Sequence, residues 1–255
     1  MIPNPILRVL SSIQARRVRA LLMGGQACVL YGAAEFSRDT DLALLPSPQN
    51  FSRLRQALRD LDADVIAVPP FAPAYLRRGH AVHFRCQHPD AKGLRVDVMT
   101  RMRGVAPFSR LWARRMSLEL SGGLTCEVMG LADLVQAKKT QRDKDWPMIR
   151  RLVEAHYFQH RDHAGRAQVR FWLRELRTPQ LLVEVAQQWP ELWRAERARR
   201  GLLEQARPGR ETRLGAALLR EERAEREADA RYWQPLKAEL EWLRRAPTAR
   251  DPAGA

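Results

Sequence analysis

The stretch of residues 17–45 constrains the fold more than any other part of the sequence. Residues 17–23 form a largely apolar run that stops at Gly24-Gly25, an uncharged helical pattern follows at 26–33, and residues 40–45 form a second short strand pattern. A strand, a glycine turn, a helix and a further strand are typical of a sheet with helices packed against it. The stretch therefore predicts an α/β fold (α+β), with a small mixed sheet and flanking helices.

The other elements of the first 160 residues follow from the spacing of apolar residues. We expect helices at 4–16, 51–61, 131–141 and 146–157, and strands at 64–68, 80–87 and 94–99. The last two strands alternate and are joined by turn residues, which predicts an antiparallel pair. The prolines at 69, 70 and 73 predict a loop.

The texture of the sequence changes near residue 160. Strand-like alternation stops, and the chain becomes rich in Arg, Glu, Leu and Ala. We expect an all-helical C-terminal extension, so that the predicted division is an α/β domain at 1–160, a helical domain at 161–245 and a disordered tail at 246–255. The helices of the second domain are predicted at 164–176, 179–188, 191–206 and 212–244.

The chain is strongly basic, with 44 Lys plus Arg against 29 Asp plus Glu and a net charge of +15. This balance favours anionic partners such as nucleic acid or nucleotide phosphates, or else it reflects a solvated surface that uses Arg throughout the chain. Three cysteines without metal-like spacing suggest a reduced, cytoplasmic protein. The uncharged run at 20–34 is too short to cross a membrane, so no membrane partner is expected.

Three carboxylates form the candidate catalytic site. Asp39 and Asp41 alternate on one predicted strand, so their side chains point to the same face. Asp97 lies on the strand at 94–99, on the face opposite Val96 and Val98. If the two strands are neighbours, the three acids converge, and Mg²⁺ is the cation that such oxygen ligands usually hold.

Gly24-Gly25 adds a second element to this site. Two glycines between a strand and a helix leave backbone N–H groups free to approach a phosphate, helped by the helix N-terminus. Paired glycines at such turns are common, and an Asp-x-Asp pair alone is a weak signal; the order and spacing of the parts together carry the prediction.

The combination resembles the DNA-polymerase-beta-like nucleotidyltransferase superfamily, whose signature places Gly-Gly or Gly-Ser before an acid–hydrophobic–acid motif. Within it, the sequence is similar to the minimal nucleotidyltransferases that include AbiEii-like toxins. The likeness covers about residues 17–155 and includes Val96-Asp97-Val98, the loop at 104–108, and Asp133-Leu-Val-Gln-Ala-Lys138 followed by Arg142 to Asp145. Two departures are Thr40 in place of an aliphatic residue and a Lys138-to-Arg142 spacing that is one residue short.

The resemblance implies transfer of a nucleoside monophosphate from an NTP to an acceptor hydroxyl with two Mg²⁺ ions. Asp39 and Asp41 would bind both metals, and Asp97 would bind the metal that activates the hydroxyl and assist its deprotonation. By the same resemblance, Gly24 and Gly25 would hold the triphosphate, Lys138 or Lys139 would neutralise phosphate charge, and Asp145 would orient Arg142 or the lysine. The alternative for Lys138 and Arg142 is a solvated helix face, and for Asp145 a helix N-cap or an ion pair.

Several alternatives remain open at this stage. Arg38 beside the acids can grip a phosphate or form a surface ion pair with Asp39. The net charge makes tRNA or another RNA a candidate acceptor, and an aminoglycoside-like small molecule or a protein side chain is an alternative. Family analogy adds a toxin role with a cognate antitoxin as partner. The rival from another class is a catalytically inactive relative that binds RNA or a protein through its Arg-rich helices.

Overall fold

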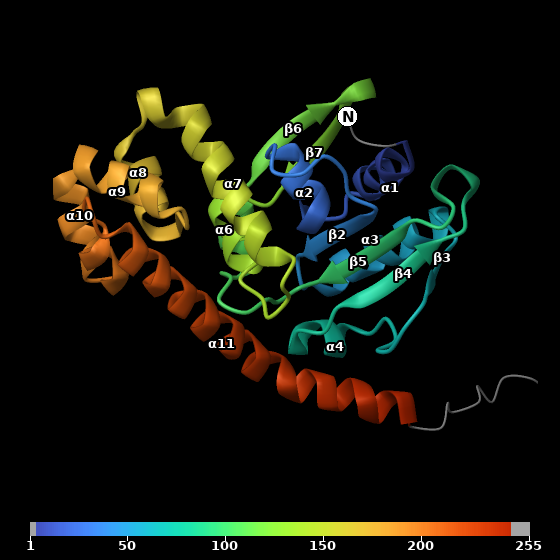
Figure 1. Cartoon of the computed structure of the whole chain (residues 1–255). Coiled ribbons are helices and arrows are strands. Elements are labelled where there is room, and N and C mark those ends of the chain that lie inside the picture. The colour runs from blue at the N-terminus through green and yellow to red at the C-terminus, as the bar shows by residue number, and fades with distance from the viewer. Residues whose placement is uncertain (1–3, 246–255) are drawn as a thin grey trace, which may run out of the picture.

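The computed structural model describes residues 4–245, with every side chain in that range except that of Ser121. The fold class is confirmed: a seven-stranded mixed sheet with flanking helices is followed by helices that end in one long helix (Figure 1). The order of strands across the sheet is β3-β4-β5-β2-β1-β7-β6. The strands are β1 (Ala20–Met23), β2 (Asp39–Leu44), β3 (Ala63–Val65), β4 (Val82–Cys86), β5 (Arg95–Met99), β6 (Met116–Leu120) and β7 (Leu124–Val128).

The helices lie close to the predicted positions except for α4 and α5, which were not predicted. Those of the first part are α1 (Asn4–Ala15), α2 (Gly24–Leu30), α3 (Pro48–Asp60), α4 (Pro73–Arg78), α5 (Phe108–Ala113), α6 (Leu131–Ala137) and α7 (Asp145–His160). Those of the second part are α8 (Arg166–Glu175), α9 (Pro179–Gln188), α10 (Pro190–Arg197) and α11 (Glu211–Arg245).

Strand β2 occupies the middle of the sheet. It runs antiparallel to β1, with Met23 opposite Asp41, and parallel to β5, with Asp41 opposite Asp97. Strand β4 pairs antiparallel with β5, as the sequence predicts. Since paired residues on neighbouring strands point to the same face, this register decides which side chains can share a site.

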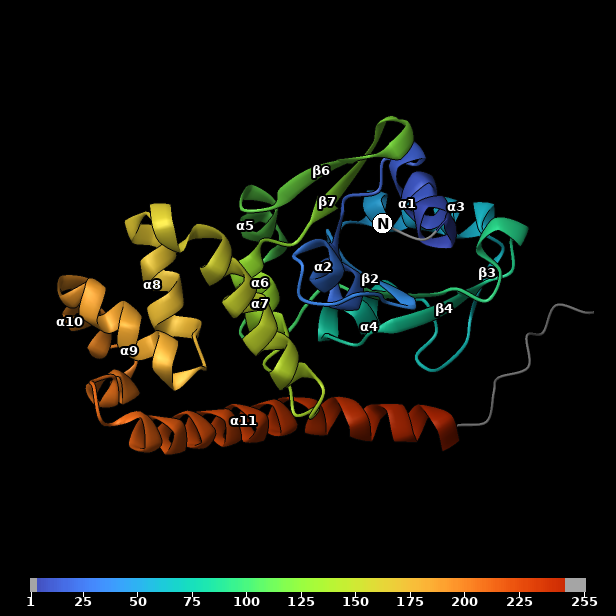
Figure 2. The ribbon, with the colours of Figure 1, turned by 45° about the horizontal axis from the view of Figure 1, so that its top comes forward.

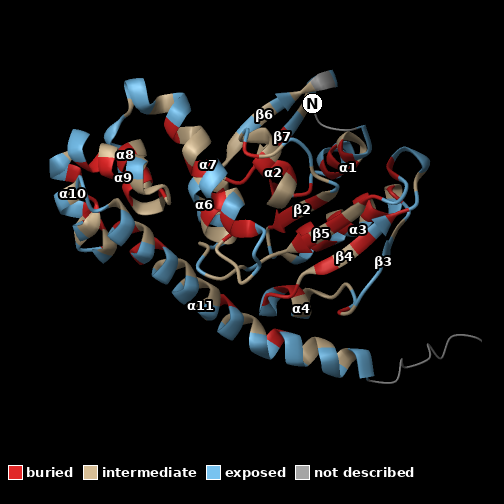
Figure 3. Ribbon diagram, in the orientation of Figure 1, coloured by how far each residue is buried: buried red, intermediate tan, exposed pale blue. Residues whose placement is uncertain are grey.

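The two faces of β2 and β5 differ in polarity. Leu42, Val96 and Val98 are buried on the face opposite the acids, and Leu42 lies with Leu10 and Ile13 of α1 around one cavity. Figure 3 shows the buried residues concentrated along these central strands and on the inner sides of the helices. The apolar side of the sheet therefore anchors the strands, while the other side is free to carry polar groups.

The hairpin of β6 and β7 was not among the predicted strands. Its sequence does carry the signal, because polar and apolar residues alternate in β6 and Gly122 and Gly123 form the turn at positive φ. Strand β7 runs parallel to β1 and extends the sheet beyond the predicted core.

Other predicted boundaries were wrong by a few residues, each for a local reason. Strand β1 begins only at Ala20, since Arg17 lies at φ 52, outside the strand region. The predicted loop at 69–73 ends where helix α4 starts, because proline is tolerated in a first helical turn. Helix α6 ends at Ala137, so Lys138 lies after the helix.

The chain after residue 160 is helical throughout its described part, as predicted. The helix expected at 191–206 is divided at Gly201, where a 3₁₀ turn (Gly201–Gln205) replaces the α-helix. Figures 1 and 2 show α11 leaving the α8–α10 group, passing the turn between α6 and α7, and reaching α4. The predicted tail at 246–255 lies outside the described residues, and the domain boundary near 160 stays a prediction. Within residues 4–245, no helix combines the length and the apolar character that a membrane crossing requires.

Candidate functional site

The three predicted acids lie on one face of two neighbouring strands. Asp39 and Asp41 alternate on β2, and Asp97 is the direct partner of Asp41 on β5. The side chains of all three are partly buried, whereas Thr40 between the first two is fully buried on the other face. The neighbouring strands that the sequence argument required are therefore present, with the acids in matching register.

Gly24 packs directly against Asp41. Its φ is +67, a conformation that glycine adopts without strain, and a Cβ built on it would lie 1.8 Å from Oδ2 of Asp41. A Cβ on Gly25 would lie 2.6 Å from the Oγ of Ser37. The turn between β1 and α2 therefore admits only glycine at its first position while the Asp41 carboxylate stays where it is.

The surroundings of Asp41 disfavour the ionised form of its carboxyl group. Burial, and next the negative charge of Asp97, raise its pKa from 3.8 to about 6, while Lys138 and the Gly25 backbone N–H act in the opposite direction. A carboxylate in this position gains from a nearby cation, which would offset both the desolvation and the repulsion.

Asp97 already has two polar partners within the structure, Arg95 and His83. Its Oδ1 accepts a hydrogen bond from Nε of Arg95 at 2.7 Å and lies 2.8 Å from Nδ1 of His83. Burial alone would raise the pKa of Asp97, but the hydrogen bonds from His83 and Arg95 outweigh it and hold the pKa below the ordinary value. Neither partner was predicted; His83 lies opposite Asp97 in the β4–β5 register, and Arg95 is two residues before it, so the alternation of the predicted hairpin was the available signal.

The fit of a divalent cation follows from the donor set and from Asp41. Carboxylate oxygens on one face are hard ligands suited to Mg²⁺, and a cation would offset the burial and the Asp97 charge that raise the pKa of Asp41. Within residues 4–245, however, no three His, Cys, Asp or Glu side chains stand close enough together to form a ready-made metal cluster. Asp97 would have to exchange Arg95 and His83 for a cation to complete one.

The residues predicted to hold phosphate gather around Asp145. Lys138 is 8% exposed, Asp145 is 2% exposed, and Nζ of Lys138 donates to Oδ1 of Asp145 at 3.1 Å. Thr140 and Arg142 both donate to Oδ2 of the same carboxylate, at 2.6 and 2.7 Å. Burial alone would raise the pKa of Asp145, but Lys138, Thr140 and Arg142 together lower it. Asp145 thus contacts the lysine and the arginine at once.

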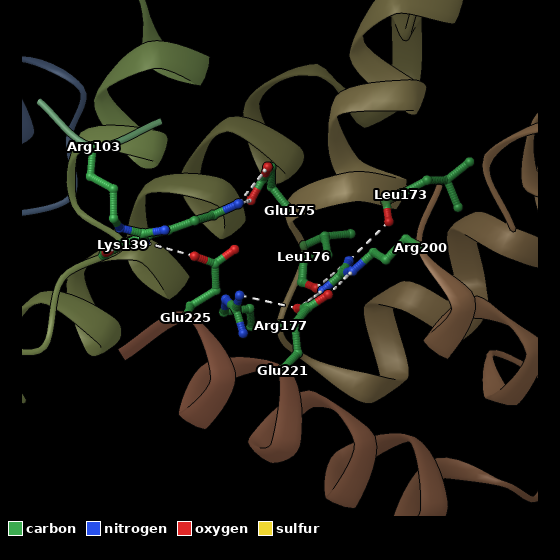
Figure 4. A network of polar contacts seen from close by, with 9 residues as sticks. All are labelled: Arg103, Lys139, Leu173, Glu175, Leu176, Arg177, Arg200, Glu221 and Glu225. Carbon is green, nitrogen blue, oxygen red and sulfur yellow. Dashed lines mark hydrogen bonds and ion pairs between the residues drawn. The ribbon is translucent and has the colours of Figure 1, made fainter. Parts of the chain in front are cut away.

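The structure separates the two candidate lysines. Lys138 is near enough to Asp41 to lower the pKa of that carboxyl group. Lys139 points elsewhere: its Nζ lies 2.9 Å from Oε2 of Glu175 on α8, and its carbonyl accepts from Arg103 (Figure 4). Of the pair, Lys138 is the one placed beside the acids.

Arg38 is exposed, and its guanidinium lies 5.9 Å from the centre of the Phe36 ring. Phe36 is itself 66% exposed. This pair flanks the start of β2 and remains free to meet a ligand that approaches the acids.

The three buried cysteines are poor nucleophiles. Burial raises the pKa of Cys28 and Cys86 to about 11 and that of Cys126 to about 12. Only the thiolate is nucleophilic, so these thiols stay unreactive at neutral pH.

No protein-family model matches the sequence, and neither does any curated protein. Among solved structures, the chain is similar to the crystal structure of a protein from H. pylori proposed to be a nucleotidyltransferase. The two share 12% identity, the match covers 89% of this chain and 94% of that chain, and the TM-score is 0.38. Similarity at this level does not assign the chain to that protein's family.

Proposed function

We propose that the chain is a metal-dependent nucleotidyltransferase that moves a nucleoside monophosphate from an NTP to an acceptor hydroxyl, breaking the bond between the α- and β-phosphates and releasing pyrophosphate. The observation that carries the proposal is the register of β2 and β5, which sets Asp41 opposite Asp97, together with Gly24 packed against the Asp41 carboxylate. Carboxylates on a central strand beside a glycine turn suit phosphoryl transfer, in which the protein mainly positions the reactants and neutralises charge.

Each residue has a defined part in this proposal. Asp39 and Asp41 would hold two Mg²⁺ ions, and Asp97 would join them on leaving Arg95 and His83. The bound ions would neutralise the triphosphate and lower the pKa of the acceptor hydroxyl. Lys138, fixed by Asp145, places a positive charge beside Asp41 for the phosphates, and Arg142 adds a second, more exposed cation. Gly24 and Gly25 let the triphosphate approach the start of α2.

The acceptor and the biological setting are finer parts of the same proposal. The net charge of +15 favours RNA, with tRNA as the first acceptor to test. A toxin role with a cognate antitoxin as partner is supported by the resemblance of the sequence alone.

Transfer is tested by incubating the protein with each α-phosphate-radiolabelled NTP, Mg²⁺ and either total RNA or a protein extract. We expect wild type to label an acceptor and Asp41→Asn to lower labelling by roughly a hundred-fold or more, since charge stabilisation of this kind is worth that much in other enzymes. Asp64→Asn is the matched control, because it makes the same change at an exposed strand carboxylate of the same sheet.

Two results contradict the proposal: no labelling by wild type under any of these conditions, or equal labelling by wild type and Asp41→Asn. In the second case a labelling activity exists elsewhere in the preparation.

The alternative function is that of an inactive relative that binds RNA. The observation in its favour is that Arg95 and His83 already contact the Asp97 carboxylate. Salt-dependent RNA binding that Asp41→Asn leaves unchanged, with no labelling, would favour it.

A further inference from the structure

A cavity lies beyond the ends of the central strands. It has a volume of about 590 Å³ and is bordered by Pro46 after β2, by the loop of residues 100–108 after β5, by Arg77 of α4 and by Tyr232 of α11. Its size is within the range of small-molecule sites. Thr100 follows Asp97 by three residues, about 10 Å along an extended chain, so the cavity is separate from the acids.

The lining of this cavity is basic and contains no carboxylate. Three arginines border it: Arg77, Arg101 and Arg103. Arg103 is neutralised, since it pairs with Glu225 at 2.7 Å and Asp229 at 3.4 Å. Arg77 and Arg101 are exposed, and within residues 4–245 neither forms an ion pair with an acid.

This charge is not simply the Arg-rich character of the whole chain. Four other cavities of the described chain also contain basic residues, and each has at least one carboxylate beside them. The acids that accompany those cations are Glu127, Asp143 with Glu222, Glu35, and Glu241. Among the five cavities, only the one beyond β2 and β5 concentrates positive charge without an internal counter-charge, which is the condition for attracting an anion.

The remaining lining is apolar and held in place. Thr100 donates from Oγ1 to the carbonyl of Leu76 at 2.6 Å, which joins the start of the 100–108 loop to α4 and brings the backbones that carry Arg77 and Arg101 together. Pro46, Val105 and Pro107 supply a wall that can pack against a flat ring. In open α/β sheets, ligands bind in the crevice beyond the carboxyl ends of parallel strands, which is where β2 and β5 place this cavity.

We propose that this cavity binds a phosphate-bearing ligand of about one nucleotide, with Arg77 and Arg101 on the phosphate and the apolar wall against the base or ribose. Guanidinium groups are suited to phosphate because they donate two parallel hydrogen bonds. A free mononucleotide and one nucleotide of an RNA chain both present a phosphate group beside a ribose and a base. The proposal does not depend on the nucleotidyl transfer proposed for the acids.

The test measures binding in EDTA, so that metal-dependent binding at the acids does not contribute. Two probes are titrated against full-length protein: AMP, and a fluorescent hexaribonucleotide with a 5′-phosphate. We expect Arg77→Gln/Arg101→Gln to weaken binding of at least one probe by roughly ten-fold or more. Binding of AMP identifies a free mononucleotide as sufficient; binding of the hexaribonucleotide alone identifies RNA as the source of the phosphate.

Two control variants separate the site from general electrostatics and from the acids. Arg59→Gln/Arg85→Gln removes the same charge from exposed positions on α3 and β4 and is expected to bind like wild type. Asp41→Asn is also expected to bind like wild type. Equal weakening by the two double variants, loss of binding in Asp41→Asn, or wild-type affinity in Arg77→Gln/Arg101→Gln would each overturn the proposal.

A measurement on the wild-type protein tests the same two arginines without any variant whose folding could affect the result. Phenylglyoxal modifies accessible arginines, and peptide mass spectrometry locates the modified residues. We expect AMP or the hexaribonucleotide to protect Arg77 and Arg101 from modification while Arg59 and Arg85 react at the same rate. Equal protection of all four arginines, or of none, contradicts the assignment.

Discussion

Burial and the charge of Asp97 raise the pKa of Asp41 to about 6, against 3.8 for an ordinary aspartate. Because the folded protein holds this proton more tightly than the unfolded chain, its contribution to stability is full below about pH 3.8 and is lost as pH rises through about 6. The difference between the two pKa values corresponds to roughly 3 kcal/mol. At neutral pH the ionised Asp41 therefore destabilises the fold, and the position favours whatever cation relieves it.

We predict that Asp41→Asn stabilises the protein above pH 6 when metal is removed with EDTA. The amide keeps the shape of the side chain without its charge, so the free energy of unfolding should rise by up to about 3 kcal/mol at pH 7.5 and change little near pH 4. Urea denaturation at the two pH values measures it. Asp64→Asn, at an exposed carboxyl, should change stability little at either pH. A destabilised Asp41→Asn at pH 7.5 would show that Asp41 is not under this strain.

His156 gives a prediction of opposite sign. Its Nδ1 accepts a hydrogen bond from Nε1 of Trp172 at 2.9 Å, and burial together with His160 lowers its pKa from 6.5 to about 4. The unfolded chain takes up this proton first, so stability is lost as pH falls from about 6.5 towards 4. At pH 5.5 the loss should be about 1 kcal/mol.

Urea denaturation of His156→Asn, compared with wild type at pH 7.5 and 5.5, isolates this contribution. The Asn oxygen can replace Nδ1 as acceptor for Trp172 but does not titrate. The difference in unfolding free energy between the two pH values should therefore shrink by about 1 kcal/mol in the variant. An unchanged difference would mean that His156 is not the titrating group.

At the scale of the elements, the turn between β1 and α2 tolerates the least change of side chain, because Gly24 packs against Asp41. Gly24 lies at φ +67 with Asp41 against it, whereas Gly93 lies at φ +79 with no heavy atom within 4 Å of its would-be Cβ. Alanine costs about 1 kcal/mol of backbone strain at either position. Only at Gly24 does the added methyl group also displace a carboxylate.

We therefore predict that Gly24→Ala and Gly93→Ala differ in activity more than in stability. Both should lose about 1 kcal/mol or more on urea denaturation. The NTP-labelling assay should fall by roughly a hundred-fold in Gly24→Ala, because Asp41 can no longer stay in place, and should remain near wild type in Gly93→Ala. Equal labelling by the two variants would remove the turn from the proposed site.

The sequence allowed the elements around this turn to be predicted because each carries a local signal. Alternation placed Asp39 and Asp41 on one face, and the pattern of β5 placed Asp97 opposite Val96 and Val98. The pairing of β2 with β5 is a contact between distant segments, and no local pattern specifies it. The same holds for His83, whose role beside Asp97 depends on the register of β4 against β5.

The end of helix α6, and which of Lys138 and Lys139 lies near the acids, were harder to predict for a similar reason. Periodicity extended the helix at 131–141 over Lys138 and Lys139, but the helix ends at Ala137 because the residues that follow turn toward α11. Which lysine faces the acids then depends on that turn. Spacing along a helix cannot supply this information once the helix has ended.

On the scale of the whole molecule, helix α11 ties the C-terminal helices to the sheet. Near its start, Glu221 pairs with Arg200 at 2.8 Å and with Arg177 at 3.1 Å; one turn on, Glu225 pairs with Arg103, as Figure 4 shows. Near its end, Glu239 lies 2.7 Å from Nε2 of the fully buried His80 and also pairs with Arg78. These contacts join α11 to Arg177 and Arg200 of the C-terminal part, to the loop after β5 and to α4.

The turn that carries Lys138 and Arg142 is among the segments held by α11. Asp229, 2% exposed, accepts from the Gln141 N–H at 2.8 Å and pairs with Arg103, whose guanidinium also donates to the Lys139 carbonyl. We predict that Asp229→Ala costs roughly 2 kcal/mol, because it removes the acceptor of the Gln141 N–H and one of the two carboxylates beside Arg103, which keeps Glu225. Urea denaturation measures the loss, and Glu241→Ala, exposed on the same helix, should stay within about 0.5 kcal/mol of wild type.

The same variant separates a general loss of stability from a local release of the turn. If α11 holds the turn, the Gln141 amide should exchange its hydrogen faster in Asp229→Ala under conditions where the protein remains folded, while amides of β2 keep their protection. The KM for NTP should then rise more than kcat falls, since Lys138 and Arg142 would still be present but less well positioned. Uniform acceleration of exchange across β2 and the turn would instead mean that Asp229 supports the fold as a whole and has no particular hold on the phosphate-binding residues.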